Sequence, residues 1–153
     1  LYQILFRGKN NIECSPNSLN KTGFVKSEIV GGNLSILYSL LGSKSDIKTD
    51  NKILFIEDLD EYLYHVDRMI ISLKRAGKFN NIKAMIVGSM TKMHDNKIKF
   101  GMNAKEIIKY HTKEFNFPVC FNFPAGHQKN NRPVILGKVS KLDINSNLVC
   151  LSQ

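Results

Sequence analysis

The chain has 153 residues, enough for one domain with a sizeable core, and its hydrophobic (42%) and charged (23%) fractions exclude a disordered protein. Its longest apolar runs are far shorter than the ~18 residues that a membrane helix needs, so we expect no membrane segment. The formal net charge is +9, but the lysines are spread without a run of five or more, which favours a solvated basic surface over a specific nucleic-acid site.

The three cysteines do not form a pattern for disulfides or zinc. Cys14, Cys120 and Cys150 are an odd number without Cys-x-x-Cys spacing, and the last two lie in apolar runs where a thiol behaves as a small core side chain. We therefore expect a reducing, cytoplasmic compartment. No signal peptide is visible at the start, and the missing initiator Met fits either processing or a start inside a longer protein.

The first strand and helix are expected only after a polar segment at the start of the chain. Residues 1–22 are rich in Asn, Lys and Ser and predict a connecting segment, which leaves residues 23–153 as the domain. Residues 24–30 predict a strand that ends at two glycines. Asn33 then predicts the N-cap of a helix that continues to Leu41.

A second strand and helix follow. Residues 52–56 form a short apolar run, typical of a strand buried on both faces, which delivers Glu57 and Asp58 at its C-terminal end. Asp60 predicts an N-cap, with acidic residues in the first turn of the helix. Apolar residues at helical spacing lead to a basic last turn, with Gly77 just beyond the helix.

The remaining segments predict one more strand-helix unit and then strands. Residues 84–87 predict a buried strand, and Asn103 with Glu106 resembles a capping box at the start of a helix. Further strands are expected at 118–123, 133–139, 141–144 and 148–151, the last three as a β meander. The order predicts an α/β domain whose sheet is partly parallel, flanked by helices, and antiparallel at the end.

Candidate functional residues lie where predicted strands end, because loops at the carboxyl ends of strands carry the sites of open α/β sheets. Glu57, Ser89 and His127 occupy such positions. Pattern alone also allows plainer roles: Glu57 as a charge that favours the next helix through its dipole, and His127 as a surface loop residue. A carboxylate that orients a histidine is, however, the acid-base part of a hydrolytic triad.

No nucleophile accompanies this pair. Ser35 and Ser39 lie within a predicted helix, and Ser89 follows a glycine but lacks the G-x-S-x-G elbow. None of the cysteines has the surroundings of a reactive thiol.

Two other ligand sites have only weak support. His65, His94 and His111 do not have metal-ligand spacing, so we expect no metal and no cofactor. Gly31-Gly32-Asn33 before a helix is able to cradle an anion, but a tight turn with an N-cap is the favoured interpretation, because the motif is neither G-x-G-x-x-G nor a P-loop.

Five motifs together resemble a known family. Their order is Gly31-Gly-Asn-Leu-Ser-Ile-Leu, Ile53-Leu-Phe-Ile-Glu-Asp-Leu-Asp-Glu, Val66-Asp-Arg-Met-Ile, Phe123-Pro-Ala-Gly-His and Leu136-Gly. This order and spacing resemble the C-terminal half of the LD-carboxypeptidases, the muramoyltetrapeptide carboxypeptidases, a serine peptidase family that also includes microcin-immunity peptidases. The resemblance runs from about residue 24 to the end of the chain.

The resemblance implies a two-domain enzyme whose C-terminal domain is of the swivelling β/β/α kind. It implies that Glu57 is the acid and His127 the general base of a Ser-His-Glu triad, with the serine and the oxyanion hole in an N-terminal domain. The implied reaction removes the terminal D-alanine from murein tetrapeptide during peptidoglycan recycling, without a metal. The implied enzyme is cytoplasmic and homodimeric.

The chain departs from the family pattern in one respect: no segment matches the serine-bearing motif. We therefore expect the N-terminal domain of the same parent chain to be the missing partner, and this chain alone to be inactive. The alternative is a non-catalytic domain that binds peptide or a polyanion, which the absent serine and the net charge of +9 would also fit.

Overall fold

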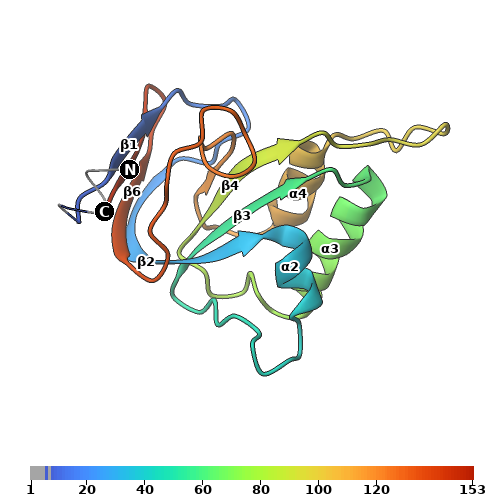
Figure 1. Ribbon diagram of the computed structural model, residues 1–153, viewed down its shortest axis with the longest axis horizontal. Helices are drawn as coiled ribbons and strands as arrows, with labels where there is room; N and C mark the ends of the chain where they lie inside the picture. Colours follow the sequence, from blue (N-terminus) through green and yellow to red (C-terminus); the bar gives the residue numbers. More distant parts are fainter. Residues whose placement is uncertain (1–5, 7) are drawn as a thin grey trace.

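A seven-stranded, partly parallel sheet is the frame of the structure, a computed structural model that describes residue 6 and residues 8–153. The elements are β1 (Asn11–Cys14), β2 (Gly23–Asn33), α2 (Leu34–Ser39), β3 (Ile53–Leu59), α3 (Leu63–Arg75), β4 (Ala84–Thr91), α4 (Ala104–Thr112), β5 (Val119–Cys120), β6 (Val139–Ile144) and β7 (Val149–Ser152). Helices lie along the parallel half of the sheet, and the antiparallel strands curve away at the other end (Figure 1).

Strand β2 joins the two halves of the sheet, whose order is β1-β7-β6-β2-β3-β4-β5. Its first part, residues 23–28, pairs antiparallel with β6, and its second part, residues 29–33, pairs parallel with β3. In the second part, a Cβ on Gly31 would lie 1.8 Å from the carbonyl oxygen of Phe55. Only a residue without a side chain fits at this point of β2.

Strands β3 and β4 are buried on both faces, which explains their continuous apolar sequences. On one face, Leu54 and Val87 pack in a core with α2, α3 and α4. On the other face, Phe55 and Ile86 pack in a second core with β1, β6 and β7. The predicted α/β class, with a partly parallel sheet flanked by helices, is confirmed.

Both central strands extend farther than predicted. Strand β3 continues to Leu59, so Glu57 and Asp58 lie inside it, and β4 continues through Ser89 to Thr91. The reason is that the two strands keep pairing beyond their apolar runs, with Asp58 opposite Met90 and Leu59 opposite Thr91.

The predicted start of α3 was wrong. Asp60 has φ +64° and its backbone N–H donates to the carbonyl of Thr91 (2.9 Å), so it still belongs to the end of the β3–β4 pair. The helix begins at Leu63, after Tyr62, and has no acidic residue in its first turn. Its basic last turn and the glycine beyond it are as predicted.

The other two predicted caps are confirmed. The side chain of Asn33 accepts a hydrogen bond from the backbone N–H of Ile36 and caps α2. Asn103 and Glu106 form the complete capping box of α4. In both cases a side-chain oxygen satisfies backbone donors that the first turn leaves unpaired.

The C-terminal strands form only in part. Residues 133–138 are not a strand, and only Val119 and Cys120 of the predicted strand 118–123 are in β5. Instead, the N–H of Gly137 donates to Ile29 (2.8 Å), and the N–H of Ile29 donates to Lys138 (3.2 Å). These bonds bring the chain beside β2, where β6 and then β7 follow.

The predicted connecting segment contains a strand. Within residues 1–22, β1 pairs antiparallel with β7, a pairing that the sequence did not predict. Only Ile12 and Cys14 turn inward from β1, too few for a recognisable alternation. Farther along, Lys21 pairs with Val119 of β5, so the segment connects opposite ends of the sheet order.

None of the helices in the described part of the chain has the length and apolar character needed to cross a membrane.

Candidate active site

Glu57 enters the site from β3, one residue beyond the buried apolar run. The register of the β3–β4 pair shifts between Ile56 and Asp58, so the strand is irregular where Glu57 lies. Beside it on β4, a Cβ on Gly88 would lie 3.2 Å from the Cβ of Glu57 and 2.4 Å from the carbonyl oxygen of Ala125. The absence of a side chain at Gly88 therefore leaves room for the glutamate.

His127 ends the segment that follows β5. Backbone hydrogen bonds hold this segment against β4: the N–H of Phe123 donates to Val87 (3.1 Å), and the N–H of Ser89 donates to Ala125 (2.9 Å). The sequence places a histidine two residues after Ala125, where the chain leaves the sheet. The site thus combines β3 with the loop next to β4.

Gly126 allows this loop to lie directly over Glu57. Its φ is +110°, a conformation that favours glycine. A Cβ on Gly126 would lie 2.6 Å from Ser89 Oγ and 2.7 Å from Glu57 Oε2. Any side chain at Gly126 would displace the loop from the carboxylate.

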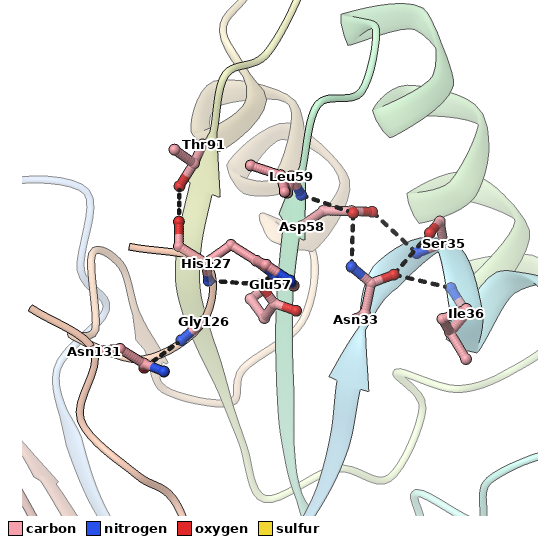
Figure 2. Close-up of polar contacts among 10 residues, drawn as sticks. All are labelled: Asn33, Ser35, Ile36, Glu57, Asp58, Leu59, Thr91, Gly126, His127 and Asn131. Atoms are coloured by element: carbon pink, nitrogen blue, oxygen red, sulfur yellow. Dashed lines mark hydrogen bonds and ion pairs between the residues drawn. The ribbon is translucent and has the colours of Figure 1, made fainter. Parts of the chain in front are cut away.

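Two polar contacts fix the loop on either side of the histidine. Asn131 Oδ1 accepts a hydrogen bond from the backbone N–H of Gly126 (3.0 Å), and Thr91 Oγ1 donates to the carbonyl of His127 (2.7 Å). Figure 2 shows both contacts above and below the histidine. The sequence interpretation did not identify Thr91 or Asn131, because neither lies in a motif that indicates its partner.

Glu57 and His127 form a dyad. Nδ1 of His127 lies 2.8 Å from Glu57 Oε2, and the backbone N–H of His127 donates to the same oxygen at 3.1 Å (Figure 2). The Glu57 side chain is 7% exposed, whereas that of His127 is 53% exposed. The buried Glu57 therefore orients the exposed His127.

The dyad has the electronic arrangement of a general base. The hydrogen bond with Glu57, followed by the charge of Glu57, raises the pKa of His127 above its usual value. With Nδ1–H directed at the carboxylate, the neutral imidazole keeps its Nε2 lone pair as an acceptor. Among the described residues, no hydrogen bond engages Nε2.

Asp58, the next residue on β3, holds the beginning of α2. Its carboxylate accepts hydrogen bonds from Asn33 Nδ2 (2.8 Å), the backbone N–H of Ser35 (3.0 Å) and the backbone N–H of Leu59 (2.8 Å). Burial raises the pKa of Asp58, and these hydrogen bonds oppose the rise. The contacts are visible on the right of Figure 2.

This connection also clarifies the Gly-Gly-Asn motif. Asn33 uses its Oδ1 to cap α2 and its Nδ2 to bind Asp58, so both ends of its amide are occupied within the fold. The N-cap of the sequence interpretation is confirmed, but the predicted turn is wrong, because Gly31 and Gly32 lie inside β2 and pair with β3. The link to Asp58 was not predicted, although the two residues lie at the ends of neighbouring parallel strands.

The other histidines lie outside the dyad. His111 is buried and binds Asp67 across α3 and α4 (2.7 Å). His94 binds Asp60 (2.6 Å), and His65 binds Glu61, which lies just before α3 (3.1 Å). In residues 6 and 8–153, no group of three His, Cys, Asp or Glu side chains is arranged to hold a metal ion.

Comparison with known proteins shows to which family the chain is related. The family described as the LD-carboxypeptidase C-terminal domain matches residues 26–142. The probable murein peptide carboxypeptidase of Bacillus subtilis is 33% identical over 125 residues, and a putative carboxypeptidase of Rickettsia conorii is 32% identical over 118 residues. These matches cover 82% and 77% of this chain.

The chain belongs to the LD-carboxypeptidase C-terminal domain family. Among solved structures, the fold of this LD-carboxypeptidase domain is similar to muramoyltetrapeptide carboxypeptidase from Oxalobacter formigenes, with a TM-score of 0.89 and 22% identity. That match covers 98% of this chain but 51% of the solved chain. Likewise the domain spans 39% of the Bacillus relative and 35% of the Rickettsia relative.

Proposed function

We propose that this LD-carboxypeptidase domain supplies the glutamate and histidine of a Ser-His-Glu triad, and that the parent enzyme removes the terminal D-alanine from murein tetrapeptide. The observation that carries the proposal is the 2.8 Å contact between Glu57 Oε2 and His127 Nδ1, with the histidine exposed at the site. The substrate class follows the names of the relatives, a murein peptide carboxypeptidase and a muramoyltetrapeptide carboxypeptidase.

The reaction would use His127 twice. Nε2 takes the proton of the serine hydroxyl as the serine attacks the carbonyl carbon of the scissile amide, and Glu57 stabilises the imidazolium through Nδ1–H. The imidazolium then gives that proton to the departing amine of D-alanine, leaving an acyl-enzyme. A water molecule deprotonated by the same Nε2 hydrolyses the ester and restores the serine.

The serine would come from an N-terminal domain of the same parent chain. Ser89 is the serine next to the dyad, but its Oγ is buried beneath the loop and makes no hydrogen bond among the described residues. Ser35 Oγ is bound to Asn33 Oδ1 (2.7 Å). Neither hydroxyl is presented to substrate, so the domain alone would be inactive.

In the parent enzyme, this domain would follow the N-terminal domain. Residues 1–22 would connect the N-terminal domain to residues 23–153, with β1 as the part of the connection that joins the sheet. We also propose that the parent is a cytoplasmic homodimer that needs no metal or other cofactor and binds no nucleic acid specifically.

The dyad is tested in the parent protein by measuring D-alanine release from murein tetrapeptide. His127→Ala and Glu57→Ala should each lower kcat by ~10⁴-fold, because removing a triad member leaves only the residual contribution of binding and the oxyanion hole. His94→Ala is the matched control, since His94 also binds a carboxylate but belongs to the exposed Asp60 pair. Turnover near the wild-type rate in both dyad variants would disprove the assignment.

The location of the nucleophile is tested by labelling with a fluorophosphonate, which reacts with activated serines. The label should attach to a residue of the parent that precedes this domain, and His127→Ala should abolish labelling. The 153-residue chain alone should not be labelled. Labelling of Ser89 would show instead that the domain carries its own nucleophile.

A further inference from the structure

Two thiols from the outermost strands of the sheet lie against the same second core. β1 and β5 stand at opposite ends of the strand order, and Cys14 and Cys120 are their last residues. Cys120 is fully buried in the apolar cluster of that core, and Cys14 packs against the same cluster while remaining partly exposed. The curvature of the sheet therefore brings to one core two cysteines that are more than a hundred positions apart in the sequence.

The chain after Cys14 runs along β5 and fixes this proximity. The backbone of Lys21 exchanges two hydrogen bonds with Val119, of 2.9 and 3.0 Å. Asn20 Oδ1 accepts the N–H of Phe121 at 2.8 Å. Both neighbours of Cys120 are thus bound to the segment that begins at Cys14.

The two thiols differ in reactivity. A side-chain hydrogen bond with Cys120 lowers the pKa of Cys14, although partial burial opposes the change. The same hydrogen bond, followed by burial, raises the pKa of Cys120. Cys14 is the member of the pair that solvent reaches, so it is the member that would meet an oxidant first.

Cys150 provides an internal contrast. On β7, Val149 and Leu151 point into the core, so Cys150 between them points to the other face. Its Sγ contacts Asn11 Oδ1 (3.3 Å) and Ser152 Oγ (3.7 Å) rather than another thiol.

We infer that Cys14 and Cys120 form a redox pair that a peroxide converts into an intramolecular disulfide. The Cys14 thiolate attacks one peroxide oxygen, the O–O bond breaks, and a sulfenic acid and hydroxide form. The Cys120 sulfur then attacks the Cys14 sulfur, its proton leaves with the sulfenic hydroxyl as water, and the S–S bond closes. Two thiols are oxidised and one peroxide is reduced to two waters.

The disulfide would join the segment around β1 covalently to the strand that leads to His127. Such a reversible bond is the form that disulfides take in reducing compartments, where they are transient and redox-sensing. The inference does not depend on the proposed peptidase function.

The test is oxidation of the reduced 153-residue chain with a slight excess of hydrogen peroxide, followed by alkylation and non-reducing peptide mapping. We expect one peptide pair joined through Cys14 and Cys120, alkylated Cys150, and full reversal by dithiothreitol. Because the bond closes a loop of more than a hundred residues, oxidation should also raise Tm by roughly 5–15 °C. Cys150→Ser is the matched control and should behave like the wild type.

Variants separate the two steps. Cys14→Ser should abolish both the disulfide and the Tm increase, and in Cys120→Ala a dimedone probe should label Cys14 as a trapped sulfenic acid. Circular dichroism verifies that both variants are folded, and the wild-type peptide map decides the question if one is not. Alkylation of all three cysteines after peroxide treatment, a bond that includes Cys150, or bonds only between chains would each overturn the inference.

Discussion

His127 contacts Glu57 Oε2 twice, through its ring Nδ1 at 2.8 Å and through its own backbone N–H at 3.1 Å. The carboxylate therefore fixes both the orientation of the imidazole and the position of the loop that carries it. Because the oxygen is buried and the ring is exposed, the pair combines a rigid acceptor with an accessible base.

The pH dependence of the parent enzyme should report this contact. Since Glu57 raises the pKa of His127, kcat/KM in the wild type should fall as pH drops through a value above about 6.5, the reference for histidine. Glu57→Gln should lower kcat by ~10⁴-fold and move this acidic limb to lower pH. A variant whose limb stays at the wild-type pH would show that Glu57 does not set the pKa.

The same pair should influence stability in a defined pH range. A histidine whose pKa is raised by folding contributes stability that is complete below its unfolded pKa and is lost as pH rises through its folded pKa. The stability difference between the wild type and Glu57→Gln should therefore shrink as pH rises through that range. Urea unfolding of the chain at a series of pH values measures it; a difference that grows with pH would contradict the assigned shift.

Gly126→Ala should damage the site by steric conflict. The new Cβ would fall within 2.7 Å of both Ser89 Oγ and Glu57 Oε2, so the loop must move and kcat of the parent should fall at least ~100-fold. Gly101→Ala is the control, because Gly101 also has positive φ (+88°) but open space around it. Equal losses in the two variants would attribute the effect to backbone strain alone.

Asp58→Ala should destabilise the beginning of α2. The change leaves the backbone N–H of Ser35 and the amide of Asn33 without their acceptor, at a cost of about 1–3 kcal/mol in the free energy of unfolding. Asp143→Ala provides the comparison, since Asp143 makes no side-chain hydrogen bond in the described part of the chain. Urea denaturation should show the loss for Asp58 only.

Asp67→Ala should affect stability without affecting catalysis. It leaves the buried ring of His111 without its acceptor between α3 and α4, which should cost about 1–3 kcal/mol in the free energy of unfolding. D-alanine release by the folded parent should keep the wild-type kcat. A large fall in kcat in protein that remains folded would mean that the buried His111–Asp67 pair influences the active site.

The sequence by itself determined the class of fold, and its resemblance to a known family indicated the two residues that form the dyad. Apolar runs at 53–56 and 84–87 predict strands buried on both faces, and Asn33 and Asn103 predict caps, because these signals depend on neighbours within a few positions. The motif order also indicated the family that the comparisons confirm. The prediction of an N-cap at Asp60 was wrong. Aspartate is a common capping residue, but the backbone of Asp60 pairs with Thr91 at the end of the β3–β4 pair instead.

Only the tertiary structure decided which side chains meet. The contact between Glu57 and His127 joins residues 70 positions apart in the sequence. It requires the loop at Gly126 to lie close over β3 and β4, which is possible because Gly88 and Gly126 have no side chains. The placement of Cys14 and Cys120 against one core requires the whole sheet to curve. Local patterns specify strands and turns, whereas such contacts depend on strand order and curvature, which no short stretch of sequence encodes.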